Sequence, residues 1–308
     1  MTIPPLTIGT RGSPLALAQT QETRARLAAE HGVEPEHFRI VIIRTSGDVI
    51  QDRALAESGG KGLFTRELDL ALIAGEIDFA VHSSKDLPTD LPEEIVIAGY
   101  LPRENVRDAF IGRGGAGLSD LPEGAVIGTA SLRRAAQVKR FRGDLRTVLL
   151  RGNVETRLAK VQNGAVDGTL LALAGLRRLG LEKHATEILP LDAFLPAAGQ
   201  GAIGITCRAA DHATREALSP ILDAATVAAL AAERAFLKAL DGSCRTPLAG
   251  LAVVESDALS FRGEALQADG SRTIAASGKG AVAEAASIGA GAAREILDRL
   301  PGGVASLS

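Results

Sequence analysis

The sequence predicts an α/β protein, because short runs of β-branched residues alternate with longer Ala- and Leu-rich helical patterns. Its 308 residues are enough for two or three domains. Hydrophobic residues make up 46% and charged residues 23%, close to ordinary globular usage, which argues against extensive disorder. Aromatic residues are only 3%, so the cores must be built from Ala, Val, Leu and Ile.

Strand and helix patterns alternate in two series along the chain. The first series predicts strands at 6–9, 39–45 and 77–81 and helices at 14–31 and 64–74. The second predicts strands at 125–128, 147–150 and 168–172 and helices at 132–141 and 154–163. An Ala-rich helix at 225–240, an alternating segment at 250–262 and a helical tail at 281–300 then indicate a small α+β domain.

Cysteine usage and the N-terminus point to a cytoplasmic protein. Cys207 and Cys244 are too few for a disulfide framework, and neither they nor the five scattered histidines show the spacing of a zinc site. The N-terminus has no basic segment followed by a long apolar run, so we expect no secretory signal. The longest uncharged stretch, 193–207, is shorter than a membrane span. We therefore expect no bound metal and no membrane contact.

Charge is unevenly distributed. Formal net charge is −3, yet residues 133–160 hold nine basic and two acidic side chains, a charge of +7 that leaves −10 elsewhere. A local basic field in an acidic protein suits a compact anionic ligand. The alternative is a solvated helix face, which we expect for Arg140 and Arg142. The net charge and scarce aromatics argue against a nucleic-acid partner.

Two glycine-containing loops are candidate anion sites. Residues 128–134 (GTASLRR) join a strand end, two hydroxyls and a first helical turn, a combination that favours an anion at the carboxyl ends of the strands. The alternative is a simple N-cap at Ser131. Residues 58–62 fail the P-loop pattern because Gly62 follows Lys61, which leaves either one cation near a ligand or an ordinary turn.

Two further side chains invite a chemical interpretation. Asp86 follows an apolar strand, where a carboxylate can stabilise a developing cation, move a proton, or cap a turn. Cys244 lies beside Arg245, which favours the thiolate, although most lone cysteines are small buried hydrophobes. Cys207 lies in an apolar, strand-like stretch, and we expect it to be buried.

Taken together, these segments resemble the porphobilinogen deaminase (hydroxymethylbilane synthase) family. The resemblance spans roughly residues 8–250 in family order. It is carried by TRGSPLA from residue 10, GGKGLFTREL from 59, VHSSKDLPT from 81, RDAF from 107, GTASLRR from 128, LRGNVETRL from 150, LALAGLRRLG from 171, LPAAGQGAIGI from 195 and DGSCRTP from 241.

This resemblance implies an architecture and an activity. The fold would have two periplasmic-binding-protein-like lobes, 1–101 with 202–219 and 107–195, plus a small C-terminal α+β domain, 224–308, that carries the cofactor. The activity would condense four porphobilinogen molecules head to tail into linear hydroxymethylbilane, releasing ammonia. We expect a cytoplasmic monomer in tetrapyrrole (haem) biosynthesis whose product passes to uroporphyrinogen-III synthase.

The resemblance also implies roles for individual residues. Cys244 would hold a dipyrromethane cofactor through a thioether, and Asp86 would be the catalytic carboxylate. Each pyrrole carries two carboxylates, so a growing chain needs cations and hydroxyls to hold it. The expected cofactor-binding residues besides Cys244 are Lys85, Ser83, Thr129, Ser131, Arg133, Arg134, Arg157 and Gln200. Expected substrate-binding residues are Arg11, Lys61, Arg151 and Arg178.

The main rival is a two-lobe solute- or anion-binding protein without catalysis. Such a protein would share the lobes and the basic site but would be expected to carry an export signal and to have no use for Cys244.

Overall fold

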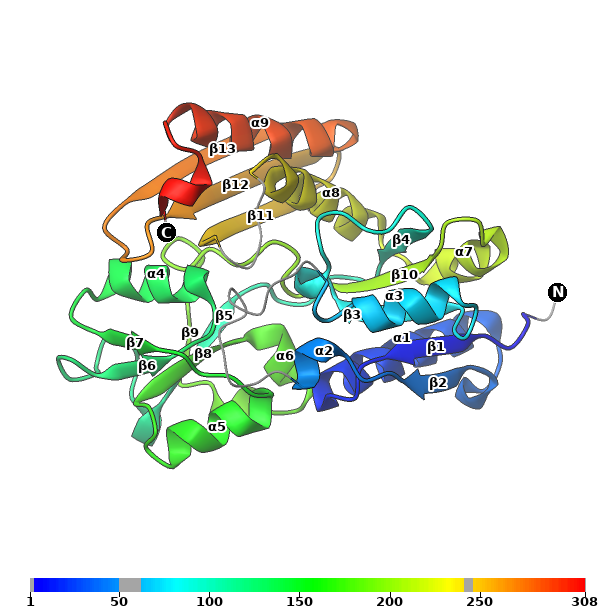
Figure 1. The fold of residues 1–308 in the computed structure, drawn as a ribbon, viewed down its shortest axis with the longest axis horizontal. Coiled ribbons are helices and arrows are strands. Elements are labelled where there is room, and N and C mark those ends of the chain that lie inside the picture. Colours follow the sequence, from blue (N-terminus) through cyan, green and yellow to red (C-terminus); the bar gives the residue numbers. More distant parts are fainter. Residues whose placement is uncertain (1–2, 50–61, 241–245, 308) are drawn as a thin grey trace. The chain divides into compact units, whose positions relative to one another are not determined.

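A computed structural model describes residues 3–49, 62–240 and 246–307 (Figure 1). The chain divides into two units. One comprises residues 1–51, 60–104 and 202–227, and the other comprises 52–59, 105–201 and 228–308.

The first unit contains a five-stranded mixed sheet. Its strand order is β2 (Arg39–Ile42), β1 (Thr7–Thr10), β3 (Phe79–Ser83), β10 (Ile203–Arg208), β4 (Ile95–Tyr100). Strand β1 runs parallel to β2 and β3, whereas β10 runs antiparallel to both β3 and β4. The helices of this unit are α1 (Pro14–His31), α2 (Ser46–Val49), α3 (Arg66–Ile73) and α7 (His212–Leu218). The expected strands at 6–9, 39–45 and 77–81 are confirmed with slightly different ends.

The second unit repeats that strand plan in a second sheet. Its order is β7 (Arg146–Val148), β6 (Val126–Gly128), β8 (Gly168–Ala172), β5 (Asp108–Gly112), β9 (Glu187–Ile188). Strand β6 is parallel to β7 and β8, and β5 is antiparallel to β8 and β9. The helices are α4 (Leu132–Phe141), α5 (Val154–Gln162) and α6 (Leu173–Arg178). Each sheet thus places one antiparallel strand in the fourth position.

A third, antiparallel sheet completes the second unit. It consists of β11 (Leu248–Glu255), β12 (Ala258–Leu266) and β13 (Thr273–Ala281), with α8 (Ala224–Ala239) and α9 (Ala285–Asp298) beside it (Figure 1). Gly289 of α9 permits close helix packing, because a Cβ there would lie 1.9 Å from the Ala232 carbonyl oxygen of α8. The predicted class is confirmed: two α/β lobes, each with its sheet, and a small C-terminal α+β domain. The boundaries predicted for three domains stay a prediction.

Several strands escaped the sequence patterns. The alternating segment 250–262 is part of two strands, which turn at Ser256 with a φ of +56°. The expected tail helix at 281–300 is confirmed as α9, whereas β13, β4 and β5 were not expected. Cys207 is fully buried in β10, as predicted, and burial raises its pKa to about 11.

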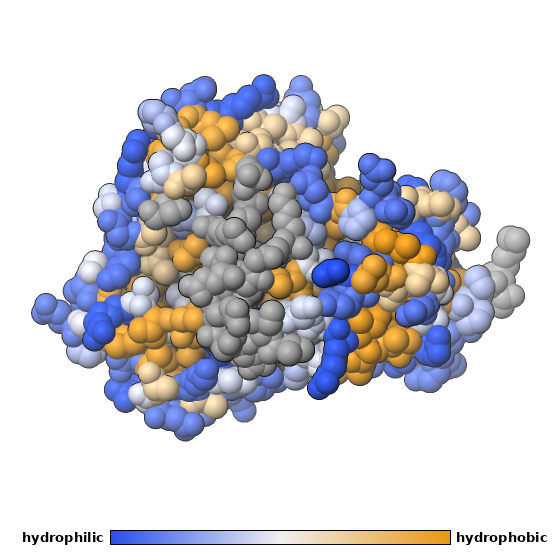
Figure 2. All heavy atoms as spheres, viewed as in Figure 1, coloured by the Kyte–Doolittle hydropathy of each residue, from blue (hydrophilic) through white to orange (hydrophobic). Residues whose placement is uncertain are grey.

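The surface mixes hydrophilic and hydrophobic side chains on the face that Figure 2 presents. Hydrophobic groups gather over α3, where Leu70 and Ile73 are among the exposed apolar side chains. The opposite face of α3, with Leu68 and Leu72, is buried in the core of the first unit. Helix α3 therefore buries one set of apolar side chains in the core and exposes a second set to solvent.

Candidate active site

Asp86 lies directly after β3, in the 3₁₀ turn Ser84–Asp86. The Ser84 N–H donates to the Ala202 carbonyl oxygen at 3.0 Å, which ties this turn to the segment that leads into β10. The Asp86 side chain is 31% exposed, and one carboxylate oxygen lies 3.5 Å from Nη1 of Arg11. A carboxylate held by its backbone but still open to solvent can meet a positive group or an N–H donor of a ligand.

Arg11 is held from two sides. Its guanidinium carbon lies 4.3 Å from the ring centroid of Phe64, a cation–π contact. The ion pair with Asp86 fixes the other side. The Arg11 side chain is four-fifths buried, so its charge is only partly screened by water.

His82 and Ser83 also line this site. His82 Nε2 lies 2.9 Å from Thr206 Oγ1, and Ser83 Oγ donates to Gln19 Oε1 at 3.0 Å. Burial, assisted by the charge of Arg11, lowers the pKa of His82 to about 3. At neutral pH this imidazole is therefore uncharged, and Arg11 is a cation close to it.

A polar cavity of about 60 Å³ lies beside Asp86. That volume corresponds to about two water molecules, so it suits a polar substituent better than a whole ring. Its polar lining side chains are Arg11, Ser13, Gln19, His82, Ser83 and Asp86. Lys85 stands next to Asp86 in the same turn and is half-buried. Lys61 and Cys244 lie outside the described residues.

In the second unit, Asp108 is the centre of a buried charge cluster. It is fully buried at the start of β5 and accepts from Arg133 Nη1 at 2.9 Å and from Arg134 Nη2 at 2.7 Å. Gln200 Nε2 also donates to it at 2.9 Å. The structure therefore brings three predicted site residues together around one carboxylate. No role for Asp108 was predicted, although a charged residue heading an apolar strand signals a need for cationic partners.

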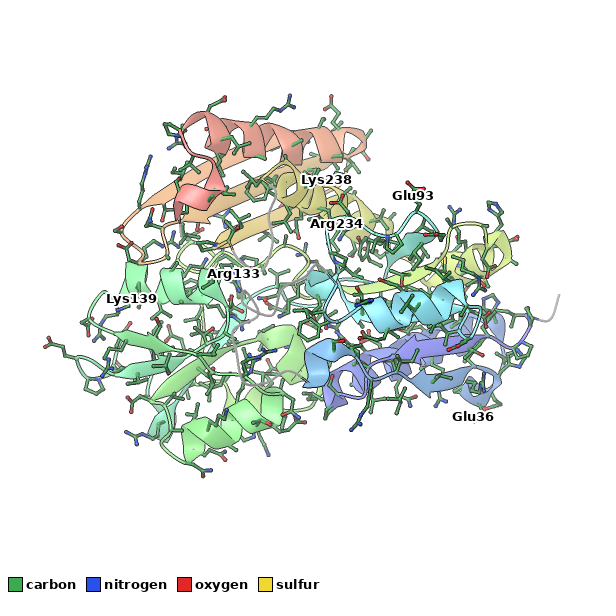
Figure 3. The ribbon with its side chains drawn as sticks, viewed as in Figure 1. Glu36, Glu93, Arg133, Lys139, Arg234 and Lys238 are labelled. Carbon is green, nitrogen blue, oxygen red and sulfur yellow. The ribbon has the colours of Figure 1, made fainter. Side chains whose placement is uncertain are left out.

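Arg133 lies at the start of α4 (Figure 3). Both arginines make further bonds within the cluster. Arg133 Nη1 also donates to Gln137 Oε1 and the Leu195 carbonyl oxygen, and Arg134 Nη1 donates to the Leu170 carbonyl oxygen. Burial lowers the pKa of Arg133, and the charge of Asp108 opposes that effect. The buried Nε atoms of both arginines have no acceptor among the described residues. Two unsatisfied cationic N–H donors fit a ligand that bears carboxylates.

Thr129 and Ser131 shape the entry to α4. Ser131 is the N-cap: its side chain accepts from the Arg134 N–H at 3.4 Å, and its own N–H donates to Thr129 Oγ1 at 3.1 Å. The capping alternative for Ser131 is thus what this structure displays. The cap fixes the first turn, which carries both arginines of the Asp108 cluster.

The remaining predicted arginines of the second unit are half-buried: Arg151 lies in the loop before α5, Arg157 within α5 and Arg178 at the end of α6. Arg157 Nε donates to the Gly152 carbonyl oxygen at 2.8 Å, and Arg178 Nη2 to the Gly201 carbonyl oxygen at 3.2 Å. The Arg151 carbonyl oxygen accepts from Lys160 Nζ at 3.2 Å. None of these three arginines contacts Asp108 in any hydrogen bond among the described residues.

The expectation that Arg140 and Arg142 are solvated is wrong. Arg140 Nη1 lies 3.0 Å from Glu264 Oε2 and 3.3 Å from Thr273 Oγ1, so it joins α4 to the third sheet. Arg142 pairs with Asp144 at 2.6 Å. These partners lie on separate elements or beyond the helix end, which helical periodicity alone does not include.

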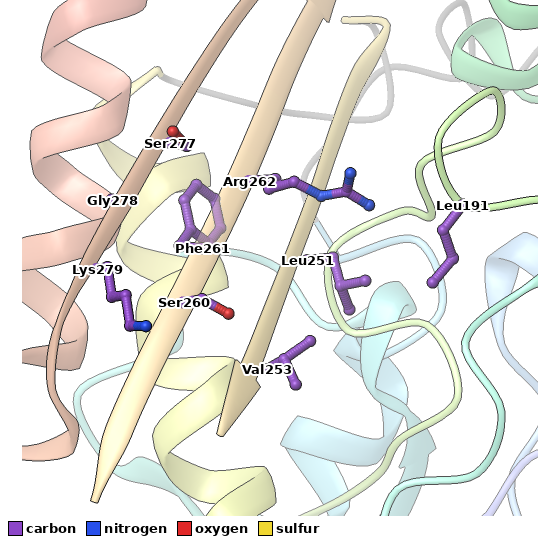
Figure 4. A pocket seen from close by; sticks show the side chains of 9 residues that line it. All are labelled: Leu191, Leu251, Val253, Ser260, Phe261, Arg262, Ser277, Gly278 and Lys279. Atoms are coloured by element: carbon purple, nitrogen blue, oxygen red, sulfur yellow. The ribbon is translucent and has the colours of Figure 1, made fainter. Parts of the chain in front are cut away.

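A larger cavity, with a volume of about 440 Å³, lies elsewhere, on the third sheet (Figure 4). Its lining includes Arg262, Lys279 and Leu251 but no residue predicted for the site. Choosing the site by cavity volume alone would therefore select a region that contains none of the predicted site residues.

Metal ligands and membrane spans concern the described ranges, 3–49, 62–240 and 246–307. No three His, Cys, Asp or Glu side chains there gather as they would around a metal ion. No helix in those ranges is both long enough and apolar enough to cross a membrane.

Two family models match the chain. Residues 6–216 match the porphobilinogen deaminase dipyromethane cofactor binding domain, and residues 227–298 match the porphobilinogen deaminase C-terminal domain.

Curated relatives and solved structures were also compared with the chain. A porphobilinogen deaminase of Nitrobacter hamburgensis is 57% identical over 293 residues, covering 95% of this chain and 93% of the relative. That of Paracoccus denitrificans is 53% identical over 297 residues, covering 96% and 95%. Among solved structures, a TRAP periplasmic solute binding protein from Desulfovibrio salexigens matches 72% of this chain and 73% of its own, at 9% identity and a TM-score of 0.43. That likeness is weak.

Proposed function

This chain belongs to the porphobilinogen deaminase family, and we propose from that premise the reaction it catalyses and the residues that carry it. It is a transferase that condenses four porphobilinogen molecules head to tail into linear hydroxymethylbilane in tetrapyrrole (haem) biosynthesis. Each condensation breaks a C–N bond and forms a C–C bond. The α-proton lost by the attacking ring balances the amino group that leaves as ammonia, and one water supplies the hydroxyl when the finished four-ring chain is released. Identity of 57% over almost the whole chain is the observation that carries this assignment.

Asp86 is the proposed catalytic residue. Loss of ammonia from porphobilinogen leaves a cationic azafulvene, which a nearby carboxylate stabilises. The same carboxylate can accept the pyrrole N–H and then receive the α-proton. Its partial exposure and its fixed backbone support this role, because the group is both accessible and oriented. Arg11, which pairs with it, would bind a substrate carboxylate together with Lys61, Arg151 and Arg178.

The cofactor is proposed to be a dipyrromethane attached to Cys244. When bound, it supplies the pyrrole end to which new units are added. The chain's part is to hold its carboxylates. Arg133 and Arg134 fit that task because each has a buried Nε–H without an acceptor among the described residues. The hydroxyls of Ser83, Thr129 and Ser131, the amide of Gln200 and the cations of Lys85 and Arg157 complete the proposed donor set.

We also propose a cytoplasmic monomer that hands its product to uroporphyrinogen-III synthase. Light scattering of the purified chain tests the monomer: a mass near 31.8 kDa is expected, and twice that value would contradict it.

Intact-mass measurement tests the function and separates it from passive anion binding. The purified chain should carry a covalent addition of two pyrrole units, and Cys244→Ala should carry none and form no bilane. Cys207→Ala is the matched control, since its buried thiol has no part in attachment, and it should keep both the adduct and the activity. A fully active Cys244→Ala, or an unmodified active chain, would contradict the cofactor assignment.

A further inference from the structure

Glu233 is a fully buried carboxylate that none of the proposed roles uses. It lies on α8, where Oε2 accepts the Gly199 N–H at 2.6 Å and Oε1 accepts the Ala252 N–H at 2.9 Å. An isolated buried carboxylate is costly, and backbone N–H donors offset that cost. One side chain thus joins α8, β11 and the turn around Gly199.

The turn that Glu233 holds carries Gln200. Gly199 and Gly201 have φ values of +76° and +88°, in the left-handed region that favours glycine. Between them, the buried Gln200 donates to the Val106 carbonyl oxygen at 2.8 Å and to Asp108 Oδ1 at 2.9 Å. A turn of two left-handed glycines has little intrinsic preference for one shape, so an external anchor is needed to place Gln200.

The bonds continue from Gln200 to the two arginines. The Asp108 carboxylate accepts hydrogen bonds from Gln200, Arg133 and Arg134. A shift of the Gln200 side-chain amide therefore changes the hydrogen bonds that Asp108 makes with the two arginines. Glu233 therefore lies at one end of a connected polar network that ends at the guanidinium groups proposed to bind the cofactor.

Glu233 also anchors both elements that flank Cys244 in the sequence. Helix α8 ends at Ala239 and strand β11 begins at Leu248, and Glu233 joins the two through the Ala252 N–H. Any change at this carboxylate is thus transmitted to both flanking elements.

We propose that Glu233 is a positioning residue for cofactor loading: it fixes the Gly199–Gly201 turn so that Gln200, Asp108 and the two arginines are set to receive the carboxylates of the dipyrromethane. The inference rests on the proposed function. Glu233 itself touches no reacting atom and acts through Gln200.

Glu233→Gln is the direct test in the full-length chain. The amide keeps one oxygen and places an NH₂ group against the other backbone donor, so Gly199 or Ala252 loses its acceptor. We expect amide hydrogen exchange at one of these residues to accelerate about tenfold or more, which corresponds to about 1.4 kcal/mol per factor of ten. We expect covalent loading of the cofactor-free chain by porphobilinogen, followed by intact mass, to slow by a similar factor.

Glu187→Gln is the matched control. Glu187 also accepts a backbone N–H, that of Leu118 at 3.0 Å, in the same unit but outside the network of Asp108 side-chain bonds. Its loading rate should stay within about twofold of the parent. Loading is compared at a temperature where both variants are fully folded, so that a general loss of stability does not slow it.

The outcomes separate the inference from the function. Equal loading by Glu233→Gln and the parent would overturn the inference alone. A parent chain that takes up no pyrrole would overturn both. If Glu233→Gln does not fold, amide hydrogen exchange in the parent chain serves as the test. The inference requires that the Gly199 amide exchanges slowly and that cofactor loading slows this exchange further. Fast exchange, or exchange that loading does not change, would overturn the inference.

Discussion

The two α/β lobes share a strand plan, yet each uses an aspartate–arginine pair differently. In the first, Asp86 has Arg11 at 3.5 Å, and both side chains remain partly exposed. In the second, Asp108 is fully buried and accepts from Arg133, Arg134 and Gln200. The number of partners and the access of water distinguish the pairs, whereas the residue types are the same.

This difference indicates which of the two carboxylates is available for chemistry. A buried carboxylate with three charged or polar donors is committed to the protein, and removing it leaves two uncompensated cations. An exposed carboxylate with one cation costs the fold little when it is lost. We therefore expect substitution of Asp108 to reduce mainly stability, and substitution of Asp86 to reduce mainly turnover.

Asp108→Asn should have the largest effect, and on stability. The neutral amide leaves Arg133 and Arg134 buried without a counter-charge, which typically costs about 3–5 kcal/mol. Urea unfolding monitored by circular dichroism measures this cost. A loss below about 1 kcal/mol would contradict the contrast between the pairs.

Asp86→Asn should instead reduce turnover by about 10²–10³-fold, the usual result of removing one preorganised electrostatic group. Stability should change by less than about 1 kcal/mol because the side chain is partly exposed. Porphobilinogen consumption by cofactor-loaded protein gives the turnover. A loss of turnover of less than tenfold would mean that Asp86 only stabilises the turn in which it lies.

Asp69 sharpens the comparison because it is a buried carboxylate without a cationic partner among the described residues. Burial raises its pKa to about 6, and the charge of Glu67 adds to that rise. The folded state therefore prefers protonated Asp69, and its stabilising contribution is complete below about pH 4 and lost as the pH rises through 6. Asp69→Asn should be more stable than the parent by about 2–3 kcal/mol at pH 7 and equal to it below pH 4. Urea unfolding from pH 4 to 7 measures the gain, and a gain independent of pH would contradict it.

Arg140→Ala should have the smallest effect. Loss of its bonds to Glu264 and Thr273 should destabilise by about 1 kcal/mol, since the ion pair is only partly buried. Cofactor loading should match the parent, because Arg140 makes no bond to Asp108 among the described residues. Thermal unfolding and intact mass check the two expectations, and impaired loading would extend the cofactor site along α4.

Local patterns in the sequence predicted the elements that carry the site but not their pairing. Apolar strands followed by polar loops indicated the position of Asp86, and Ser131 was visible as an N-cap. The Asp108 cluster could not be read in this way, because its partners lie 25, 26 and 92 residues away. Arg140 was misjudged for the same reason, since Glu264 is 124 residues distant. Strand β5 shows no period of two because all of its residues are buried.

The position of β10 has a consequence for synthesis of the chain. In the first sheet β10 pairs with both β3 and β4, although it lies more than 100 residues after β4 in sequence. A nascent chain that stops before Ile203 leaves two strand edges without hydrogen-bond partners, and such edges invite aggregation. The N-terminal lobe therefore closes only after the second sheet has been made, and the high contact order of this pairing should make its closure a slow folding step.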